Sequence, residues 1–382
     1  METEVRSRVV LIPCDTYEEE TVYERLKEGV ALLGGMEQFV KPEDKVLLKP
    51  NLVRKAELSR AVVTHPAVMG AVARLVREAG VKTVTAGDSC GFGEATAAAA
   101  EVGMDQILQK YEVPVVDFSG AGLIPYEAGA QAKGFYLCRE VLEADALINV
   151  CKMKTHALER VTGAVKNLYG CIYGLHKAKG HTRFPGADSF ARQLIDLNRF
   201  VKPRLAIMDG IIAMEGNGPT SGDPFPMKVL LVSADPVALD SVYCRLINLK
   251  PELVSTNYHG EKMGLGHYRD NEIEVAVPGE GVIAPEDLLE RYGNPNFNVD
   301  RKLVRTGKWV KLDRFLKLFQ KKPYIDPGKC VRCGICVESC PVDGKAVRFS
   351  GGRKNPPVYD YKKCIRCFCC QEMCPHKAIQ VK

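Results

Sequence analysis

The sequence predicts an α/β body, built on a mostly parallel sheet with helices on both faces, and a small C-terminal α+β module. In the first 300 residues, short apolar runs bounded by polar residues alternate with helical stretches, which is typical of buried parallel strands joined by helices. Residues 301–382 hold 20 Lys and Arg against 6 Asp and Glu, whereas residues 1–300 hold 33 against 41. This charge asymmetry indicates a separate module at the end of the chain.

The apolar runs place the elements of the body. Strands are predicted at residues 9–12, 46–48, 81–86, 113–118, 146–150, 205–208 and 229–232, and helices at 18–33 and 66–79. The second helix opens on Pro66, a residue favoured at the first helical position because its missing N–H would have no partner there. The pattern leaves open whether the body is one sheet or two lobes.

Composition limits the classes of protein to consider. No apolar run approaches eighteen residues, so no membrane-spanning helix is expected. The chain opens on acidic and polar residues, unlike the apolar core of an export signal, and a cytoplasmic location is therefore expected. In that reducing compartment, 15 cysteines indicate metal or redox chemistry rather than disulfides.

The C-terminal module contains an internal repeat. The run from Cys330 to Pro341 returns 34 residues later as the run from Cys364 to Pro375, and each reads C-x2-C-x2-C-x3-C-P, the cluster-binding pattern of bacterial ferredoxins. Three thiolates on one tight loop surround a four-iron cluster, and the fourth ligates the other cluster. A zinc site is the competing interpretation, but zinc sites typically use paired C-x2-C knuckles. The repeat therefore predicts two 4Fe-4S clusters.

The repeat predicts two crossed ligand sets and one spare cysteine. The first set is Cys330, Cys333, Cys336 and Cys374, and the second is Cys364, Cys367, Cys370 and Cys340. Cys369 aligns with Ile335 in the repeat, so we expect it to fill apolar space. The module resembles bacterial two-cluster ferredoxins over residues 323–382.

The module differs from small soluble ferredoxins, which tend to be acidic, in its positive charge. The negative clusters offset part of that charge. The remaining positive charge should make the clusters easier to reduce. It should also favour binding to an acidic surface, either of a redox partner protein or of the body itself. A basic module can also bind nucleic acid, but the cluster ligands are the simpler account of the basic residues and we expect no nucleic-acid partner.

A basic connector, residues 301–322, joins the two parts. Trp309, Leu312, Leu316 and Phe319 recur at helical spacing among its basic residues. Such a stripe can lie on a membrane surface, but packing on the neighbouring domain is the commoner outcome.

Several polar segments of the body follow predicted strands or flank their helices. They are Lys49-Pro50-Asn51, Thr64-His65-Pro66, Gly87-Asp88-Ser89, Lys152-Met153-Lys154-Thr155-His156, Lys166-Asn167 and Asp235-Pro236-Val237-Ala238. Through these residues the chain resembles a family of microbial iron–sulfur proteins with a large N-terminal domain of unknown function. The resemblance spans most of residues 1–300 and implies no particular reaction.

The segment after residues 146–150 is the main site candidate. Lys152, Lys154 and His156 project to one side if it is extended, because side chains alternate along a strand. Positive charges at a strand end would hold or protonate a small anion; the alternative is a solvated basic edge. Further lining candidates are Lys49, Asn51, His65, Ser89, Lys166 and Asn167.

Other motifs of the body carry weaker signals. Gly87 to Gly91 matches the G-x-S-x-G outline of a nucleophile elbow, but no triad follows it and an anion-binding turn fits better. The acidic, glycine-rich segment from Asp209 to Pro219 predicts either a metal or acid–base site or an ordinary turn. The body carries no Walker loop and no G-x-G-x-x-G motif, so no cofactor is supported there.

These features together predict an iron–sulfur electron-transfer protein. In the preferred interpretation it is a reductase, whose ferredoxin tail delivers low-potential electrons to a small anionic substrate in the body. In the alternative it is a non-catalytic electron carrier whose body docks on a redox partner.

Protein purified without oxygen should contain about eight iron and eight sulfide per chain. Cys369→Ala should leave both contents unchanged, because Cys369 stands outside the predicted ligand sets. Elemental analysis checks the prediction. Stoichiometric zinc, or about four iron in the intact protein, would contradict two clusters.

Overall fold

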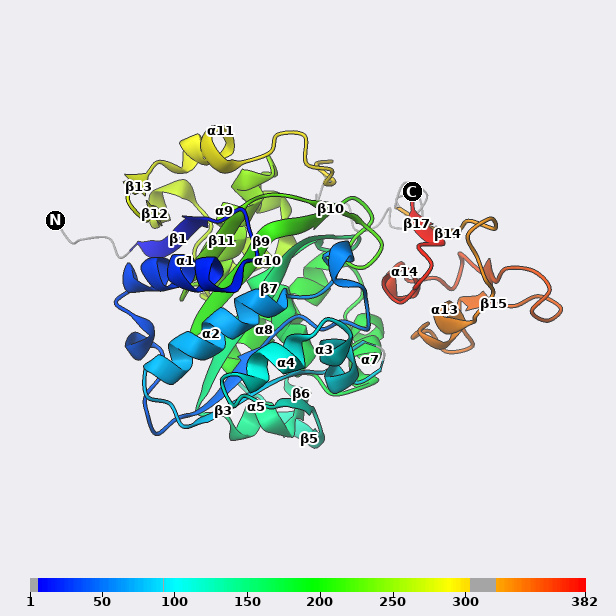
Figure 1. Cartoon of the computed structure of the whole chain (residues 1–382). Helices are drawn as coiled ribbons and strands as arrows, with labels where there is room; N and C mark the ends of the chain where they lie inside the picture. Colours follow the sequence, from blue (N-terminus) through cyan, green and yellow to red (C-terminus); the bar gives the residue numbers. More distant parts are fainter. Residues whose placement is uncertain (1–5, 92, 303–320) are drawn as a thin grey trace.

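In the computed structural model, residues 6–91, 93–302 and 321–382 are described. A large α/β body holds the N-terminal part of the chain, and the cysteine-rich module sits against one side of it (Figure 1). The apolar stripe predicted between residues 309 and 319 lies outside the described residues.

One sheet forms the centre of the body, so the prediction of a mostly parallel α/β fold is confirmed and a division into two lobes is not observed. The described residues form an 11-stranded sheet in the order β13-β12-β1-β11-β9-β7-β2-β3-β4, with β10 beside β9 and β8 beside β7. The strands are β1 (Ser7–Pro13), β2 (Lys45–Lys49), β3 (Thr83–Asp88), β4 (Val115–Asp117), β7 (Ala146–His156), β8 (Arg160–Thr162), β9 (Leu205–Glu215), β10 (Asp223–Phe225), β11 (Val229–Ser233), β12 (Ile273–Val277) and β13 (Gly281–Ile283).

The sheet contains antiparallel pairs at β11, at β13 and at the short strands β8 and β10. The pairs that run from β9 through β7, β2 and β3 to β4 are parallel, whereas β11 runs antiparallel to both β1 and β9. The carboxyl ends of β1, β2, β3, β7 and β9 therefore share one edge, where ligands bind in open α/β sheets.

Helices cover both faces of the sheet. They are α1 (Glu19–Ala31), α2 (Pro66–Glu78), α3 (Ala95–Glu101), α4 (Met104–Gln109), α5 (Arg139–Glu143), α6 (Ala164–Asn167), α7 (His176–Arg183), α8 (Ala187–Val201), α9 (Pro236–Leu246), α10 (Ser255–Lys262) and α11 (Leu288–Tyr292). Helices α1 to α4 pack on one face, and α8 and α9 pack on the other. A separate hairpin joins β5 (Gly120–Pro125) to β6 (Gly134–Cys138).

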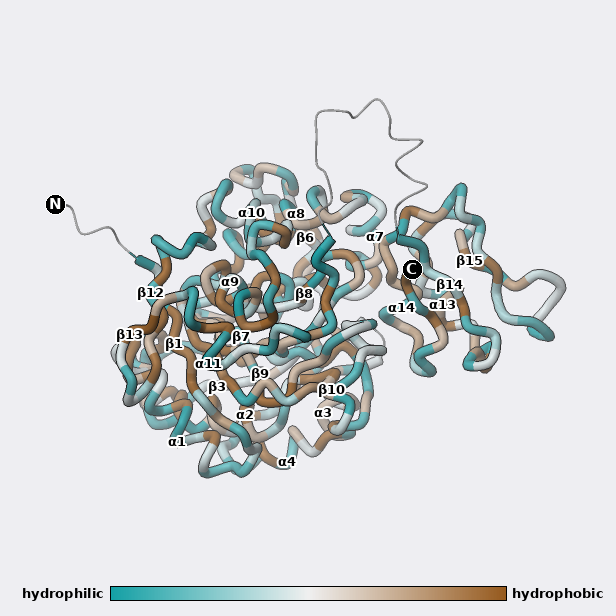
Figure 2. Tube along the Cα trace, turned by 90° about the horizontal axis from the view of Figure 1, so that it is seen from above, coloured by the Kyte–Doolittle hydropathy of each residue, from teal (hydrophilic) through white to brown (hydrophobic). Residues whose placement is uncertain are grey.

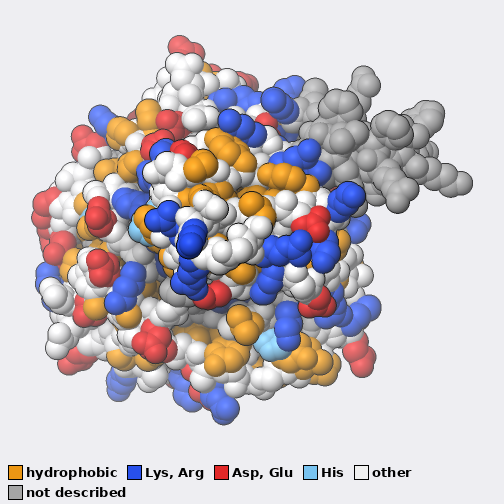
Figure 3. Space-filling model, turned by 90° about the vertical axis from the view of Figure 1, so that its right-hand side faces the viewer, with side chains coloured by type: hydrophobic (Ala, Val, Ile, Leu, Met, Phe, Trp, Pro, Cys, Tyr) orange, Lys and Arg blue, Asp and Glu red, His pale blue; other side chains and the backbone are white. Residues whose placement is uncertain are grey.

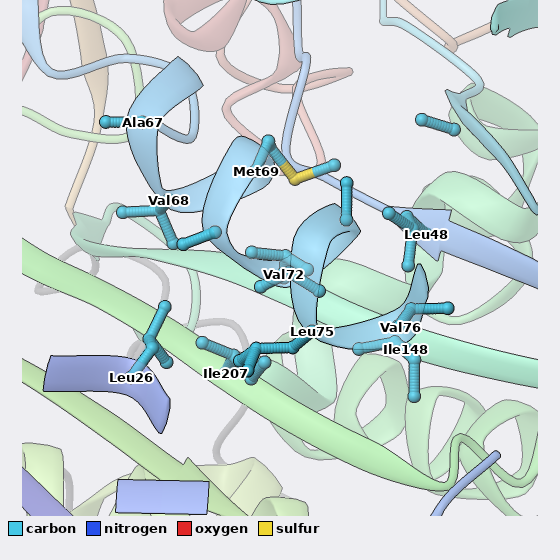
Figure 4. Packing of buried hydrophobic residues seen from close by; sticks show 14 of the residues in the cluster. Leu26, Leu48, Ala67, Val68, Met69, Val72, Leu75, Val76, Ile148 and Ile207 are labelled. Atoms are coloured by element: carbon cyan, nitrogen blue, oxygen red, sulfur yellow. The ribbon is translucent and has the colours of Figure 1, made fainter. Parts of the chain in front are cut away.

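Strand periodicity separates the two cores. In β7, Ile148 and Val150 face the α2 side, whereas Cys151 and Met153 face the α9 side. Figure 4 shows Val72 and Val76 of α2 packed toward Ile148 and the neighbouring strands. Side chains at alternate positions point to opposite faces, so one strand stabilises both layers.

The module is a duplicated unit with its own small sheets, as the cysteine repeat predicts. Its elements are β14 (Pro323–Ile325), α13 (Ile335–Glu338), β15 (Val347–Arg348), β16 (Val358–Tyr359), α14 (Cys369–Glu372) and β17 (Ile379–Val381). Strand β14 pairs with β17, and β15 pairs with β16. In Figure 2, α14 lies next to the body, whereas β15 lies on the far side of the module.

Among the described residues, no helix is both long and apolar enough to cross a lipid bilayer.

A chain that ends at residue 302 should fold into a stable body. The three large apolar clusters lie between residues 9 and 297, and a core of this size is sufficient for independent folding. We expect native-like circular dichroism and one cooperative thermal transition. A well-expressed fragment with no cooperative transition would show instead that body and module are one folding unit.

Candidate functional site where the module meets the body

The structure brings the predicted cysteines together in two groups. Cys330, Cys333, Cys336 and Cys374 line one small cavity of the module. In the other group, burial raises the pKa of the Cys364 thiol, and the neighbouring Cys367 and Cys340 raise it further; the Cys370 sulfur accepts a hydrogen bond from the Tyr359 hydroxyl at 3.2 Å. Four thiols around one cavity fit an iron–sulfur cube. Cys369 is buried at the start of α14.

A buried carboxylate joins the module to the body. Oε1 of Glu372, at the end of α14, lies 2.8 Å from Nε2 of His156, the last residue of β7. Nδ1 of His156 accepts the backbone N–H groups of Leu158 and Glu159 at 3.1 Å, so the ring proton is on Nε2, facing the carboxylate. Burial lowers the pKa of His156 to about 4, and the imidazole is therefore neutral near pH 7.

Two body residues keep that carboxylate charged. Burial alone would raise the pKa of Glu372, but His156 and Lys166 together hold it well below its usual range. Lys166 is half-buried at the end of α6. His156 and Lys166, predicted as site residues, thus bind an anion that belongs to the chain itself.

The loop after β9 holds the module with hydrogen bonds. Gln371, which is fully buried, donates through Nε2 to the carbonyl oxygens of Asn217 and Gly218 at 2.8 and 3.0 Å. The Thr220 hydroxyl donates to the carbonyl of Glu372 at 2.6 Å, and Lys377 donates to that of Gly222 at 3.0 Å. The acidic, glycine-rich segment of the sequence therefore serves as a docking loop.

Lys152 and Lys154 are buried rather than open to a ligand. They are 2% and 0% exposed. Nζ of Lys152 donates to Asp209 at 2.7 Å and to the Tyr17 hydroxyl at 3.0 Å, while Nζ of Lys154 donates to Asn51 Oδ1 at 2.6 Å. Burial lowers the pKa of Lys154 well below its ordinary value. Side chains do alternate in direction along β7, but those of Lys152 and Lys154 lie in the interior of the body.

Three asparagine amides form a chain beneath the strand ends. Asn51 donates to Asn167 at 3.0 Å, and Asn167 donates to Asn149 at 2.7 Å. Beside them, the fully buried Lys49 pairs with Asp88 at 2.9 Å. The predicted lining residues Lys49, Asn51 and Asn167 therefore fix the loops at the carboxyl ends of β2 and β7, because each side chain bonds to another element.

His65 and Ser89 lie elsewhere on the same edge. His65 caps α2, since its Nδ1 accepts the Ala67 N–H at 3.1 Å, and its ring stacks on Tyr17 at 3.5 Å. Ser89 is held by Lys177, whose Nζ donates to both its hydroxyl and its carbonyl oxygen. An ammonium that already donates to these oxygens is no proton acceptor, so the G-x-S-x-G outline does not form a nucleophile elbow.

A groove of about 630 Å³ opens at the carboxyl end of β1. Its charged lining consists of Asp15, Arg25, Lys228 and Arg291. Arg25 pairs with Glu28 and Arg291 with Glu280, but in the part of the chain that the structure describes Lys228 has no ion-pair partner. Sequence reasoning missed this groove, because its lining comes from five separate segments.

The fold and the cysteine geometry define an α/β protein that carries an iron–sulfur module at the carboxyl edge of its sheet. Residues 46–245 match the domain of unknown function DUF362, and residues 322–375 match the 4Fe-4S dicluster domain. The chain belongs to the DUF362 family, in a form fused to a 4Fe-4S dicluster domain. The 4Fe-4S dicluster domain indicates that the chain binds iron–sulfur clusters and supports an electron-transfer role.

One curated relative covers both parts of the chain. The thylakoid-associated protein of Synechocystis sp. is 39% identical over 312 residues, which are 81% of this chain and 96% of the relative. This match supports the fusion of the two parts.

Two solved structures show weaker likeness. The lactate racemase apoprotein of Thermoanaerobacterium thermosaccharolyticum aligns with a TM-score of 0.41 and 11% identity, over 62% of this chain and 56% of that one. A Thermotoga maritima protein aligns with a TM-score of 0.36 and 13% identity, over 67% and 61%. Neither likeness bears on activity.

Glu372→Ala should loosen the module from the body. The change removes the carboxylate that lies 2.8 Å from Nε2 of His156, and leaving a buried polar group without its partner costs about 1–3 kcal/mol. Hydrogen exchange at α14 and at the end of β7 should therefore accelerate about tenfold or more. Glu338→Ala is the matched control, because Glu338 holds the equivalent place in the repeat and is exposed. Equal exchange in both variants would contradict the docking role of Glu372.

Proposed function

We propose that the protein is an iron–sulfur reductase that passes electrons to a small anionic substrate held at the carboxyl edge of its sheet. The docking of α14 carries the proposal: Glu372 is buried against His156 at the end of β7. The electron-carrying module is thereby held at the edge where open α/β sheets bind ligands. An electron carrier fixed beside a ligand edge is the arrangement that a reductase requires.

The cofactors of this proposal are two 4Fe-4S clusters. Cys330, Cys333, Cys336 and Cys374 would hold one, and Cys364, Cys367, Cys370 and Cys340 the other. Such clusters accept and release one electron at a time. A cytoplasmic location supports them, since a reducing compartment keeps thiols free for iron.

We assign the substrate to the groove at the end of β1. Its volume suits a small molecule, and Lys228 supplies a cation for a carboxylate or phosphate. The groove also adjoins the module contact, because β10 contributes Phe225 to its lining and pairs Asp223 with Lys377 of the module at 3.3 Å. Lys152 donates to Asp209 and to the Tyr17 hydroxyl and does not line the groove, so we assign it no contact with the substrate.

The second candidate is an electron carrier that docks on a redox partner. Two observations favour it: Lys152 and Lys154 are buried, and the module is strongly basic. On the face of the molecule that carries the module, Lys and Arg side chains gather over the middle of the surface (Figure 3). An acidic partner protein would fit such a surface.

Turnover by the intact holoprotein separates the two candidates. Protein reduced with a viologen should be reoxidised by one member of a panel of small carboxylates and phosphates, with continued loss of reduced viologen. Acetate serves as a non-reducible control anion. If no anion oxidises the clusters but an acidic redox protein does, the carrier interpretation replaces the reductase.

Lys228→Gln should weaken use of the anion identified in that assay. A charge-assisted hydrogen bond contributes about 1.5–3 kcal/mol, so KM should rise about tenfold to a hundredfold. Lys202→Gln is the matched control, because both lysines have positive φ, 57° and 52°, and both are exposed, but Lys202 is not part of the groove. Unchanged KM in Lys228→Gln would remove the groove from the proposal.

A further inference from the structure

A buried arginine of the body has unpaired N–H groups. Arg54, in the loop after β2, is 8% exposed, and its Nη1 makes a long hydrogen bond, 3.3 Å, to the carbonyl of Lys55. Among the described residues, no hydrogen-bond acceptor meets its buried Nε and Nη2. Unpaired buried donors on a charged group are costly, so the position favours a nearby anion.

The neighbours of Arg54 include a second cation. Arg60, on the same loop, donates from Nη2 to the Thr220 carbonyl at 2.9 Å. Burial and the charge of Arg60 both lower the pKa of Arg54, and Cys374 opposes them. The Cys374 sulfur therefore lies within electrostatic reach of the Arg54 guanidinium.

Packing places Cys374 beside this loop. A Cβ atom added at Gly91 would lie 2.8 Å from Cε of Met373 and 3.5 Å from the carbonyl oxygen of Val53. Met373 and Val53 thus flank the same glycine, and the residues that follow them are Cys374 and Arg54. The contact of Thr220 with the Glu372 carbonyl, at 2.6 Å, holds the two segments together.

Glu372 lies close to both cysteine groups. It is two residues from Cys370, of the second group, and two residues from Cys374, of the first, and it lies within electrostatic reach of Cys367. Exposed cations such as Arg332 also lie on the module, but solvent and salt screen them. The buried cation that the body presents beside Cys374, of the first group, is Arg54.

We propose that Arg54 raises the reduction potential of the cluster held by Cys330, Cys333, Cys336 and Cys374 above that of its mate. Reduction adds one electron to a cluster that is already negative, and a buried cation stabilises the added charge. Electrons that enter the module therefore collect on the cluster beside the loop after β2. The body therefore determines which cluster has the higher reduction potential through Arg54, a residue outside the ferredoxin repeat.

Redox titration of the holoprotein, followed by electron paramagnetic resonance, tests the proposal. In Arg54→Gln the higher of the two midpoint potentials should fall, by ~59 mV if the ratio of reduced to oxidised cluster changes tenfold, while the lower stays in place. Arg54→Lys retains the charge and should retain the potential. The proposal is overturned if neither midpoint moves, if both move together, or if only the lower one falls.

Salt dependence of the wild type provides a second test should Arg54→Gln fail to hold its iron. At ~1 M salt the screening length falls to about 3 Å, which suppresses the influence of exposed cations. The separation between the two midpoints should persist if buried Arg54 sets it. If the two midpoint potentials converge at high salt, their difference is set by the exposed cations and the proposal is overturned.

Discussion

The contact between the Glu372 carboxylate and His156 is the interaction on which the architecture depends. It joins the last residue of β7, which with β9 is one of the two longest strands, to the helix that carries a cluster ligand. Removing one partner leaves the other buried polar group without compensation, at a cost of about 1–3 kcal/mol. The body must therefore present His156 and Lys166 in fixed positions, and the hydrogen bonds around β7 do this.

The interior of the body is correspondingly polar at the strand ends. Lys152 pairs with Asp209, Lys49 pairs with Asp88, and an amide chain passes through Asn51, Asn167 and Asn149. Each group obtains its partner from another segment of the chain, so the loops cannot move independently. A rigid edge of this kind holds an electron-carrying module at a constant distance and orientation.

Local patterns predicted the parts of the protein that depend on local physics. Apolar runs located the central strands, Pro66 located the start of α2, and the cysteine spacing located the two groups. Strands β7 and β9 continue to His156 and Glu215, well beyond their apolar runs, because their polar residues find partners more than 50 positions away in sequence. Pairings between segments that lie far apart in the chain leave no periodic pattern in the amino-acid sequence.

The same reasoning applies to the anion expected at the end of β7. The strand-end pattern predicts an anionic partner, and the carboxylate that lies 2.8 Å from His156 belongs to Glu372, more than 200 residues later in the chain. The repeat contained one usable hint: Gln371 is a buried amide in the second run, where the first has Val337. A polar residue at an otherwise apolar helical position indicates a partner outside the module.

The duplication in the module has a consequence for symmetry. A free two-cluster ferredoxin has two nearly equivalent ends, and a visiting protein can exchange electrons at either one. Here α14 is enclosed by the body, whereas Cys333 and Val331, just before α13, are exposed. Anchoring one end removes the equivalence: α14 faces the body (Figure 2) and the segment before α13 is exposed, so the two similar halves of the module have different surroundings.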